Sequence, residues 1–469
     1  MPFNKTTLKL AASPLVNKLT GAYLNGDHRI EPLYALRPQA DSIDSLIKNR
    51  ESFKINRSAL TETLLKQYNE LEAINEVIPD QVRVNIDALK QENCFTVTTG
   101  HQLQVAGGPL FFSYKILSAI KTASYCNEKN KNIKAIPVLW LASEDHDILE
   151  INHFNCLGKK YQWDSNYQGP AGKADTGEIS KLIDQLISDL GQRNNTEIIK
   201  QLLENVYVNG RSLSMATRIL VNRLFGKYGL VIIDPDTIEL KSQFKELIKQ
   251  EIFQQTSLNA INQTINSFPK DFEVQANPRE INFFYFSKDG RNRIEKHDDF
   301  WKVINTNISF KQKELIDEID HHPEKFSPNV LLRPLFQEMI LPNIAYIGGP
   351  AELAYWLELK KLFSCYAIPY PMILHRNSFL MLDHQTVSRM VEFGIQDSNL
   401  FDGKEKTINS WIEKIETGNF FQTANLELEN VFSAIEKEMA LADPTLSNSV
   451  KAELQRTKKG INHLEEKWT

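Results

Sequence analysis

Cysteine is rare in this chain of 469 residues: Cys94, Cys126, Cys156 and Cys365 stand alone, and no Cys-x-x-Cys pair occurs. This excludes a disulfide-stapled secreted domain and a zinc knuckle, because both need closely spaced cysteines. Glycine (20) and proline (19) are also few, which excludes collagen-like sequence and extended low-complexity disorder.

Long apolar runs and an excess of basic charge are also missing. No run reaches the roughly 18 apolar residues of a membrane-spanning helix, and the N-terminus lacks the apolar centre of a signal peptide. Lys and Arg number 54 against 59 Asp and Glu, a net charge of −5. We therefore expect a cytoplasmic protein that binds neither membranes nor, by a dedicated basic surface, nucleic acids.

The chain contains ample material for a large folded core. Hydrophobic residues make up 42% and charged residues 24% of the sequence, as in ordinary globular proteins. β-rich or continuously apolar runs occur at 94–99, 135–142, 229–233, 344–350 and 369–374, with helical patterns between them, such as 110–120 and 351–363. Apolar strands separated by helices predict an α/β fold with a doubly wound parallel sheet.

Insertions separate these strand–helix units. Residues 178–268 are rich in helical patterns, and the runs 282–286 and 300–303 flank Asp289-Gly290, which predicts a β-hairpin. Beyond residue 377 the chain has no strand pattern. Asp443-Pro444 predicts a helix start, and the following apolar spacing fits either a coiled coil or a single amphipathic helix. The residues of that seam are Val450, Leu454, Thr457, Ile461, Leu464 and Trp468.

Three polar clusters follow predicted strands, where parallel sheets bind ligands. The first runs from Gly100 through Gln102, Gly107 and Gly108 to a helix that carries Lys115. Glycines allow close backbone approach, and a helix N-terminus attracts anions. The segment lacks the P-loop and GxGxxG patterns, so a tight turn without a ligand is the alternative.

The second cluster is Glu144-Asp145-His146-Asp147, directly after an apolar strand. Such a density of ionisable groups suits general acid–base chemistry. His146 and His153 share a helical spacing, but no third metal ligand is evident, so no metal site is predicted. A capped helix start, with acids in its first turn, is an equally good interpretation.

The third cluster spans two segments and contains an arginine, two tyrosines and a glycine pair before a helix. Its alternative interpretation is a packed helix start, with the arginine in an ordinary ion pair. Its candidate residues are Asn329, Arg333, Tyr346, Gly348, Gly349, Glu352 and Tyr355, to which Arg376 after the last strand is added. If all three clusters lie at one sheet edge, their side chains converge on one cleft.

These motifs resemble one family, the cysteine ligases of bacillithiol biosynthesis. The resemblance is carried by TGHQ at 99–102 with GGPL at 107–110, by PVLWLASEDHD at 137–147, and by AYIGGPAELAYW at 345–356 after SPN at 327–329. His101 departs from the family pattern, which often has glutamine there. The resemblance implies amide formation between the carboxyl group of L-cysteine and the amine of glucosaminyl-malate.

The resemblance also implies an organisation. Residues 1–376 would form a Rossmann-like core with connecting insertions at about 160–215 and 240–325, and residues 377–469 a coiled-coil arm. Family members continue beyond the position of Thr469, so we expect a shortened arm whose returning helix is missing. Dimerisation through a complete arm is the implied partner contact.

A carboxylate needs activation before it acylates an amine, so we expect ATP to be used, through an acyl-adenylate or an acyl-phosphate. In this hypothesis Gly100, Gln102, Gly107, Gly108 and Lys115 bind the nucleotide. The cluster 144–147 binds the cysteine ammonium or accepts the amine proton, and the third cluster with Arg376 binds substrate. A different nucleotide-dependent transferase and a non-catalytic coiled-coil protein are the alternative functions.

Overall fold

The computed structural model describes residues 4–10, 15–37, 42–165, 167–412 and 417–468. The chain divides into two compact units: Val16–Phe379, and Leu380–Thr469 together with Met1–Leu15.

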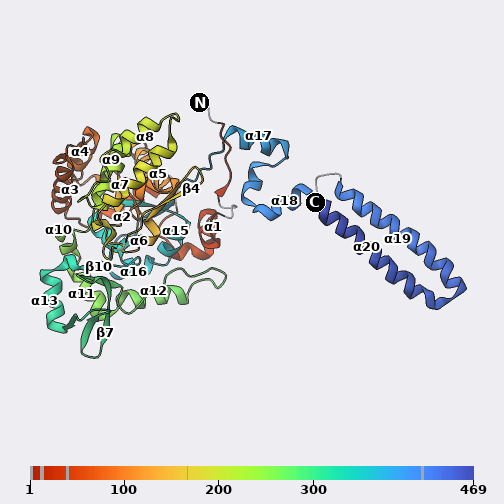
Figure 1. Ribbon diagram of the computed structural model, residues 1–469. Helices are drawn as coiled ribbons and strands as arrows, with labels where there is room; N and C mark the ends of the chain where they lie inside the picture. The colour runs from red at the N-terminus through yellow and green to blue at the C-terminus, as the bar shows by residue number, and fades with distance from the viewer. Residues whose placement is uncertain (1–3, 11–14, 38–41, 166, 413–416, 469) are drawn as a thin grey trace. The chain divides into compact units, whose positions relative to one another are not determined.

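The larger unit is built on a five-stranded parallel sheet in the order β12-β11-β1-β2-β5 (Figure 1). This confirms the predicted α/β fold and each of its five strands. The strands are β1 (Cys94–His101), β2 (Lys134–Leu141), β5 (Val231–Ile233), β11 (Asn343–Gly348) and β12 (Met372–His375). β1, β2 and β11 are buried almost throughout, which explains why their sequences read as continuous apolar or small residues.

Helices cover both faces of the sheet. On one face, Phe95 and Val97 of β1 pack against apolar side chains of α2 and α5. The other face belongs to the main core, where Trp140 of β2 packs edge-on against Phe336 of α14 at 5.5 Å between ring centres. The helices of this unit are α1 (Lys18–Asn25), α2 (Ile43–Glu51), α3 (Arg57–Glu72), α4 (Asp80–Ala88), α5 (Leu110–Lys129), α6 (Ile148–Ile151), α7 (Gly177–Leu190), α8 (Thr196–Leu203), α9 (Leu213–Phe225), α10 (Ile238–Lys241), α11 (Lys245–Gln254), α12 (Thr256–Asn266), α13 (Gln312–His321), α14 (Arg333–Ile340), α15 (Pro350–Leu357) and α16 (Lys360–Cys365).

Two local predictions need correction. The helix expected over 351–363 is divided into α15 and α16, and between them the buried carboxylate of Glu358 accepts the backbone N–H groups of Gln275 and Ala276 at 2.8 Å each. The turn at Asp289-Gly290 is present, but its second strand is 290–297, whereas 300–303 forms the strand after that. Strand 290–297 was missed because Ile294 is its only aliphatic residue.

The predicted hairpin is part of a second, antiparallel sheet in the order β10-β6-β7-β8-β9. Its strands are β6 (Phe283–Ser287), β7 (Gly290–His297), β8 (Phe300–Val303), β9 (Ser309–Lys311) and β10 (Phe326–Pro328). A further pair is formed by β3 (His153–Cys156) and β4 (Lys159–Gln162). The five-stranded inserted sheet lies between β5 and β11 in the chain, and α11 and α13 contact each other beside it (Figure 1).

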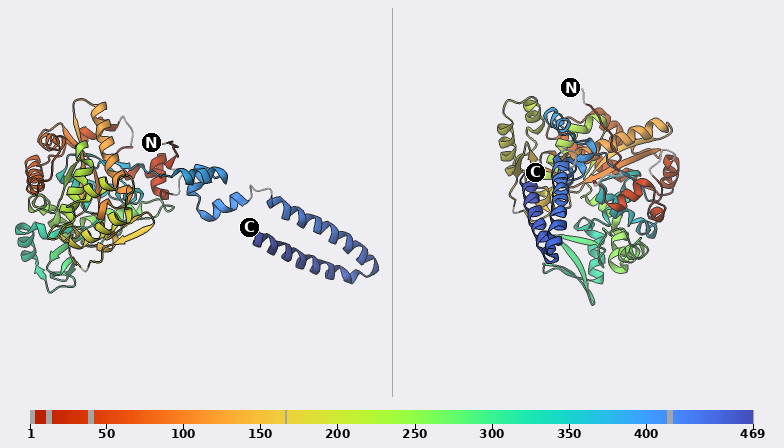
Figure 2. Two further views of the ribbon diagram at one scale, coloured as in Figure 1. Left: turned by 45° about the horizontal axis from the view of Figure 1, so that its top comes forward. Right: turned by 90° about the vertical axis from the view of Figure 1, so that its right-hand side faces the viewer.

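The smaller unit contains α17 (His384–Glu392), α18 (Lys404–Ile412), α19 (Thr417–Ala442) and α20 (Ser447–Trp468). α19 and α20 form an antiparallel hairpin, seen from two sides in Figure 2. Asp443 caps the turn before α20, as predicted. α19, which sequence patterns did not predict, is the partner of α20 in this hairpin.

Candidate functional site

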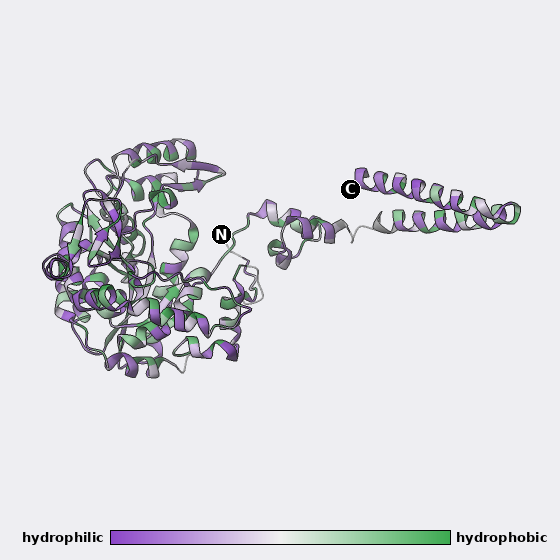
Figure 3. Cartoon of the chain, turned by 90° about the horizontal axis from the view of Figure 1, so that it is seen from below, coloured by the Kyte–Doolittle hydropathy of each residue, from purple (hydrophilic) through white to green (hydrophobic). Residues whose placement is uncertain are grey.

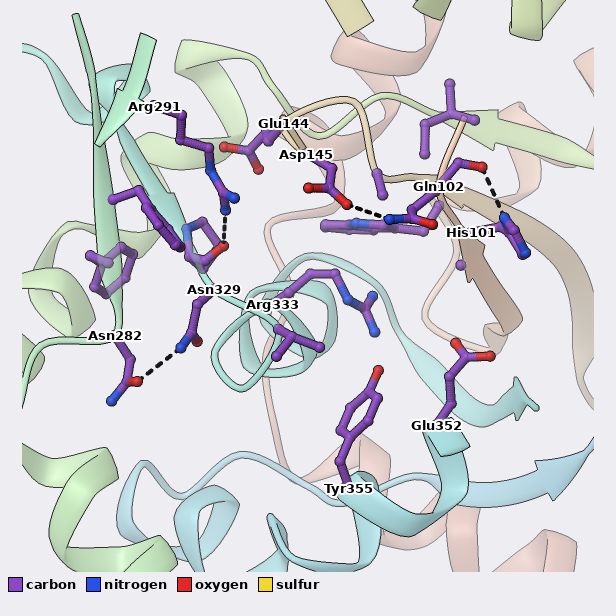
Figure 4. A pocket seen from close by; sticks show the side chains of 18 of the residues that line it. His101, Gln102, Glu144, Asp145, Asn282, Arg291, Asn329, Arg333, Glu352 and Tyr355 are labelled. Carbon is purple, nitrogen blue, oxygen red and sulfur yellow. Dashed lines mark hydrogen bonds between the residues drawn. The ribbon is translucent and has the colours of Figure 1, made fainter. Parts of the chain in front are cut away.

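A cavity of about 520 Å³ opens where β1, β2 and β11 end. These ends are level because Gly100 pairs with Trp140 and His101 with Leu141 in the register of β1 and β2. All three predicted clusters contribute side chains to this cavity (Figure 4). Ten of the predicted residues line it: Gly100, Gln102, Lys115, Glu144, Asp145, Asn329, Arg333, Tyr346, Glu352 and Tyr355.

Glu144 is held in a buried ion pair. Its Oε1 lies 2.5 Å from Nζ of Lys241, which also contacts Oδ1 of Asp236 at 2.8 Å. Burial alone would lower the pKa of Lys241, but the two carboxylates raise it, so the ammonium stays charged. Burial raises the pKa of Glu144, which Lys241 opposes. Because its carboxylate already holds Lys241 at 2.5 Å, it is poorly placed to bind a second cation from the substrate.

Asp145 is more accessible, with its side chain 32% exposed. Its Oδ2 accepts from Nε2 of Gln102 at 2.7 Å, and its Oδ1 accepts from the backbone N–H of His146 at 2.8 Å. Gln102 also donates to Oε2 of Glu150 at 2.6 Å. Of the two carboxylates of this cluster that line the cavity, Asp145 is thus the one that is both oriented and open to a ligand.

Two histidines near the cavity have opposite tautomers. Nδ1 of His101 lies 2.9 Å from the carbonyl of Gln102, which can only accept, so its Nδ1 carries the hydrogen and Nε2 is an acceptor. Burial lowers the pKa of His101 to about 4. Nδ1 of His146 instead lies 3.2 Å from Nη1 of Arg291, which can only donate, so its Nε2 carries the hydrogen. Burial and Arg291 lower the pKa of His146.

A buried network surrounds Glu352 at the start of α15. Nζ of Lys115 lies 2.7 Å from Oε2 of Glu352 and also donates to the carbonyl of Gly100. The hydroxyl of Tyr346 donates to Oε1 at 2.7 Å, and the N–H of Gly349 donates to Oε2 at 2.8 Å. Burial lowers the pKa of Lys115, and the contact with Glu352 opposes this shift. These contacts join the first and third clusters.

Arg333 occupies the middle of the cavity, between Asp145 on one side and Tyr355 and Glu352 on the other (Figure 4). Its Nη1 donates to Oε1 of Gln337 at 2.9 Å. Burial alone would lower the pKa of Arg333, but Tyr346, Tyr355 and Glu352 raise it. A charged guanidinium in this position suits a carboxylate or phosphate oxygen.

Asn329 lines the cavity but uses its side chain locally. Its Nδ2 donates to Oδ1 of Asn282 at 2.8 Å, and its Oδ1 accepts from the N–H groups of Leu331 and Leu332. These bonds shape the turn before α14, which presents Arg333. Asn329 is therefore better described as a residue that shapes the site than as a ligand.

Seven predicted residues do not line the cavity: His146, Asp147, Gly107, Gly108, Gly348, Gly349 and Arg376. Gly108 has φ +58° and a Cβ there would lie 2.7 Å from the Gln104 side chain, so local packing already requires glycine. Asp147 is the residue before α6. The guanidinium of Arg376 stacks on Phe111 and donates to Oγ of Ser378 at 2.7 Å.

Sequence patterns missed the side of the cavity that the inserted sheet supplies. Asn282, Arg279, Arg291 and Arg293 all line it. Arg291 donates Nε to Oγ of Ser327 at 3.0 Å and Nη2 to the carbonyl of Pro328 at 2.8 Å. The only sequence signal was two arginines with alternating spacing after a turn, which does not indicate what the strand faces.

No group of three or more metal-ligating side chains is placed to hold an ion anywhere in the described part of the chain. The same residues contain no helix long and apolar enough to cross a membrane.

Comparisons with known proteins agree on one family. Residues 1–377 match the family model "Bacillithiol biosynthesis BshC, N-terminal Rossmann-like domain", and residues 379–469 match the corresponding C-terminal coiled-coil domain. Both matches confirm the expected Rossmann-like fold and coiled-coil arm.

Named relatives are similar over nearly the whole chain. A protein of Flavobacterium johnsoniae is 40% identical over 96% of this chain and 85% of its own length, and one of Cytophaga hutchinsonii is 35% identical over 99% and 87%. A Bacillus cytotoxicus protein is 26% identical over 91% and 81%. Each is named "Putative cysteine ligase BshC". The chain therefore belongs to the BshC family of bacillithiol biosynthesis, and its enzyme class is that of a ligase.

Proposed function

We propose that this protein forms an amide between the carboxyl group of L-cysteine and the amine of glucosaminyl-malate. The observation that carries the proposal is the convergence of three distant loops on one cavity that offers a free carboxylate, a neutral histidine acceptor and arginines. These groups suit a substrate pair that presents an ammonium, an amine and several carboxylates.

In the reaction, a C–N bond forms between the amine and the carboxyl carbon, a C–O bond of the activated carboxyl breaks, and the amine loses its proton. Asp145 binds the cysteine ammonium or accepts that proton, because of the two carboxylates of its cluster that line the cavity it is the accessible one. Nε2 of His101 is a second acceptor lining the same cavity. Glu144 keeps Lys241 charged instead of acting on substrate.

ATP would supply the carboxyl activation that amide formation requires. The residues fit such a polyanion in one respect, since Lys115 and Arg333 are cations lining the cavity. Arg333 would hold a phosphate or carboxylate oxygen, and Lys115 would keep Glu352 and Gly100 in place beside it.

The proposal is tested by incubating the full chain with cysteine, glucosaminyl-malate and ATP, and following products by mass spectrometry and nucleotide release. We expect the amide, formed only with nucleotide turnover, and AMP or ADP identifies the form of activation. Amide formed without nucleotide would overturn the ATP requirement, and nucleotide transferred to substrate without amide would favour a different transferase.

A variant comparison separates chemistry from folding. Asp145→Asn should lower the turnover number about a hundredfold if the carboxylate binds or takes a proton. Glu295→Gln, at an exposed position of β7, is the matched control and should leave turnover unchanged. Equal turnover numbers in both variants would show that the Asp145 carboxylate takes no part in the reaction.

We also propose that the arm forms a homodimer. Val431, Ile435 and Met439 repeat every four residues on α19 and are exposed, whereas Glu436 contacts Lys451 of α20 at 3.1 Å. Apolar and polar residues alternate along both helices in Figure 3. Ile435→Ser should lower the molar mass seen by light scattering, and Leu441→Ser, exposed but off this stripe, should not.

A cytoplasmic location is part of the same proposal. It is supported by the four cysteines, which are all free thiols, as expected in a reducing compartment. Fractionation of cells that produce the tagged chain should recover it with cytoplasmic markers.

A further inference from the structure

The charges that line the cavity do not balance. Its cations outnumber its carboxylates by five to three, an excess of two positive charges, whereas the whole chain carries −5. The cations are Lys115, Arg279, Arg291, Arg293 and Arg333, and the carboxylates are Glu144, Asp145 and Glu352. A local positive excess in an acidic protein indicates that something anionic binds there.

The excess positive charge of the cavity lies on two arginines that have no partner among the described residues, Arg279 and Arg293. Lys115 is paired with Glu352, Arg291 donates to Ser327 and to the carbonyl of Pro328, and Arg333 donates to Gln337. In contrast, no hydrogen bond or ion pair of the guanidinium groups of Arg279 and Arg293 is found among the described residues. Both groups are therefore free to bind a ligand.

Arg279 stands on a backbone that a buried asparagine holds in place. Asn282, which is 1% exposed, accepts from the N–H of Arg279 at 3.1 Å and donates to its carbonyl at 2.8 Å. Asn282 also donates to Oγ of Ser257 at 2.6 Å, which anchors it to α12. A guanidinium on a fixed backbone loses less conformational entropy when it binds.

Arg293 stands on the strand next to this segment. It pairs with Phe284 in the register of β6 and β7, and it shares a sheet face with Arg291 because the two are separated by one residue. Arg291 is held in place over the ring of Phe284 at 4.0 Å. The strand therefore presents Arg293 beside an arginine whose own position is fixed.

This arginine side lies across the cavity from the end of β1. Figure 4 shows Asn282 and Arg291 on one side, and His101 and Glu352 on the other, with Arg333 between them. A nucleotide bound at the end of β1 would leave the arginine side for a different anionic group.

We propose that Arg279 and Arg293 together recognise a dianionic group of the substrate, which is the dicarboxylate of malate if the proposed function holds. Two separate guanidiniums match two carboxylates with one charge-assisted contact each. They would select a dianion over a monoanion, because a substrate with one carboxylate leaves one arginine unpaired. The second possible source of this chemistry is the polyphosphate of a nucleotide.

Calorimetric titrations of the full chain with L-malate, L-lactate, ATP and glucosaminyl-malate distinguish these sources. We expect the wild-type chain to bind L-malate more than about tenfold tighter than L-lactate, and Arg279→Gln and Arg293→Gln each to weaken malate binding about tenfold. ATP binding should not change. Because both arginines are accessible, the malate affinity should also fall as salt is raised.

Lys302→Gln is the matched control, since it removes an exposed cation of the neighbouring strand β8 that does not line the cavity. It should bind malate as the wild type does. If the arginine variants lose ATP affinity instead, the pair serves a polyphosphate and the malate assignment is wrong. If they bind both ligands normally, the inference is overturned. A wild-type chain that binds neither malate nor glucosaminyl-malate contradicts the proposed function itself.

Discussion

Nη1 of Arg333 donates to Oε1 of Gln337 at 2.9 Å, one turn further along α14. The amide of Gln337 is oriented in turn, because its Nε2 donates to Oε1 of the buried Glu338 at 2.9 Å. The orientation of the Arg333 guanidinium at the centre of the cavity is thus set by Gln337, which does not line the cavity.

This relationship predicts the result of Arg333→Lys. Lysine keeps the charge, but its single ammonium cannot contact Gln337 and a substrate oxygen with the planar geometry of arginine. We expect kcat/KM for amide formation to fall about tenfold or more while the melting temperature changes little. Arg193→Lys, at an exposed arginine that donates to the carbonyl of Asp189, is the control. An unchanged kcat/KM would show that charge alone suffices at position 333.

Glu338 predicts a pH dependence of stability. Burial raises its pKa from 4.5 to about 7, against the opposing charge of Arg50. Between these values the native chain keeps a proton that the unfolded chain has released, so the free energy of unfolding falls as the pH rises, by about 3 kcal/mol. Glu338→Gln abolishes this titration.

Denaturant unfolding at several pH values measures the effect. Relative to the wild type, Glu338→Gln should gain about 3 kcal/mol in stability between pH 4.5 and pH 7.5. The exposed Glu295→Gln should instead run parallel to the wild type. Parallel curves for both variants would contradict the raised pKa.

The Lys241–Glu144 pair predicts a strongly non-additive double mutant. Lys241→Met leaves the carboxylate of Glu144 buried without its cation, which should lower the free energy of unfolding by about 3–5 kcal/mol. Adding Glu144→Gln to that variant should recover part of the loss, because the other carboxylate that Lys241 contacts, Asp236, still has Lys173 at 3.3 Å. If the two losses simply add in urea unfolding, the pair is not energetically linked.

The position of Gly108 predicts that a substitution there lowers the free energy of unfolding for two separable reasons. Gly108→Ala places a Cβ at φ +58° and against Gln104, so both strain and a clash should lower the free energy of unfolding, by about 2 kcal/mol or more. Gly158→Ala has a similar φ of +79° with nothing within 4 Å, and should show the strain alone. Equal losses would mean that Gln104 moves aside freely.

The local sequence pattern was sufficient to predict the parallel sheet of this protein. The apolar runs of β1, β2 and β11 predict buried parallel strands, because a strand covered on both faces has no polar side to show. The polar groups that follow them, such as Asp145 and Glu352, were predicted to meet because parallel strands end at one sheet edge. Side-chain periodicity and strand ends depend on residues that are neighbours in the sequence, so they can be predicted from each segment of the chain separately.

Contacts between distant segments were decided only by the tertiary structure. Lys241, which neutralises Glu144, is separated from it by about a hundred residues, and no local pattern could reveal that the charge of Glu144 is balanced. Arg279, just before the inserted antiparallel sheet, and Arg293, on its strand β7, line the cavity at the end of the parallel sheet. α19 was not predicted because its apolar residues, such as Phe420, Leu426 and Val431, do not all lie on one face. Charge pairing and burial depend on distance in space, which the order of residues along the chain does not determine.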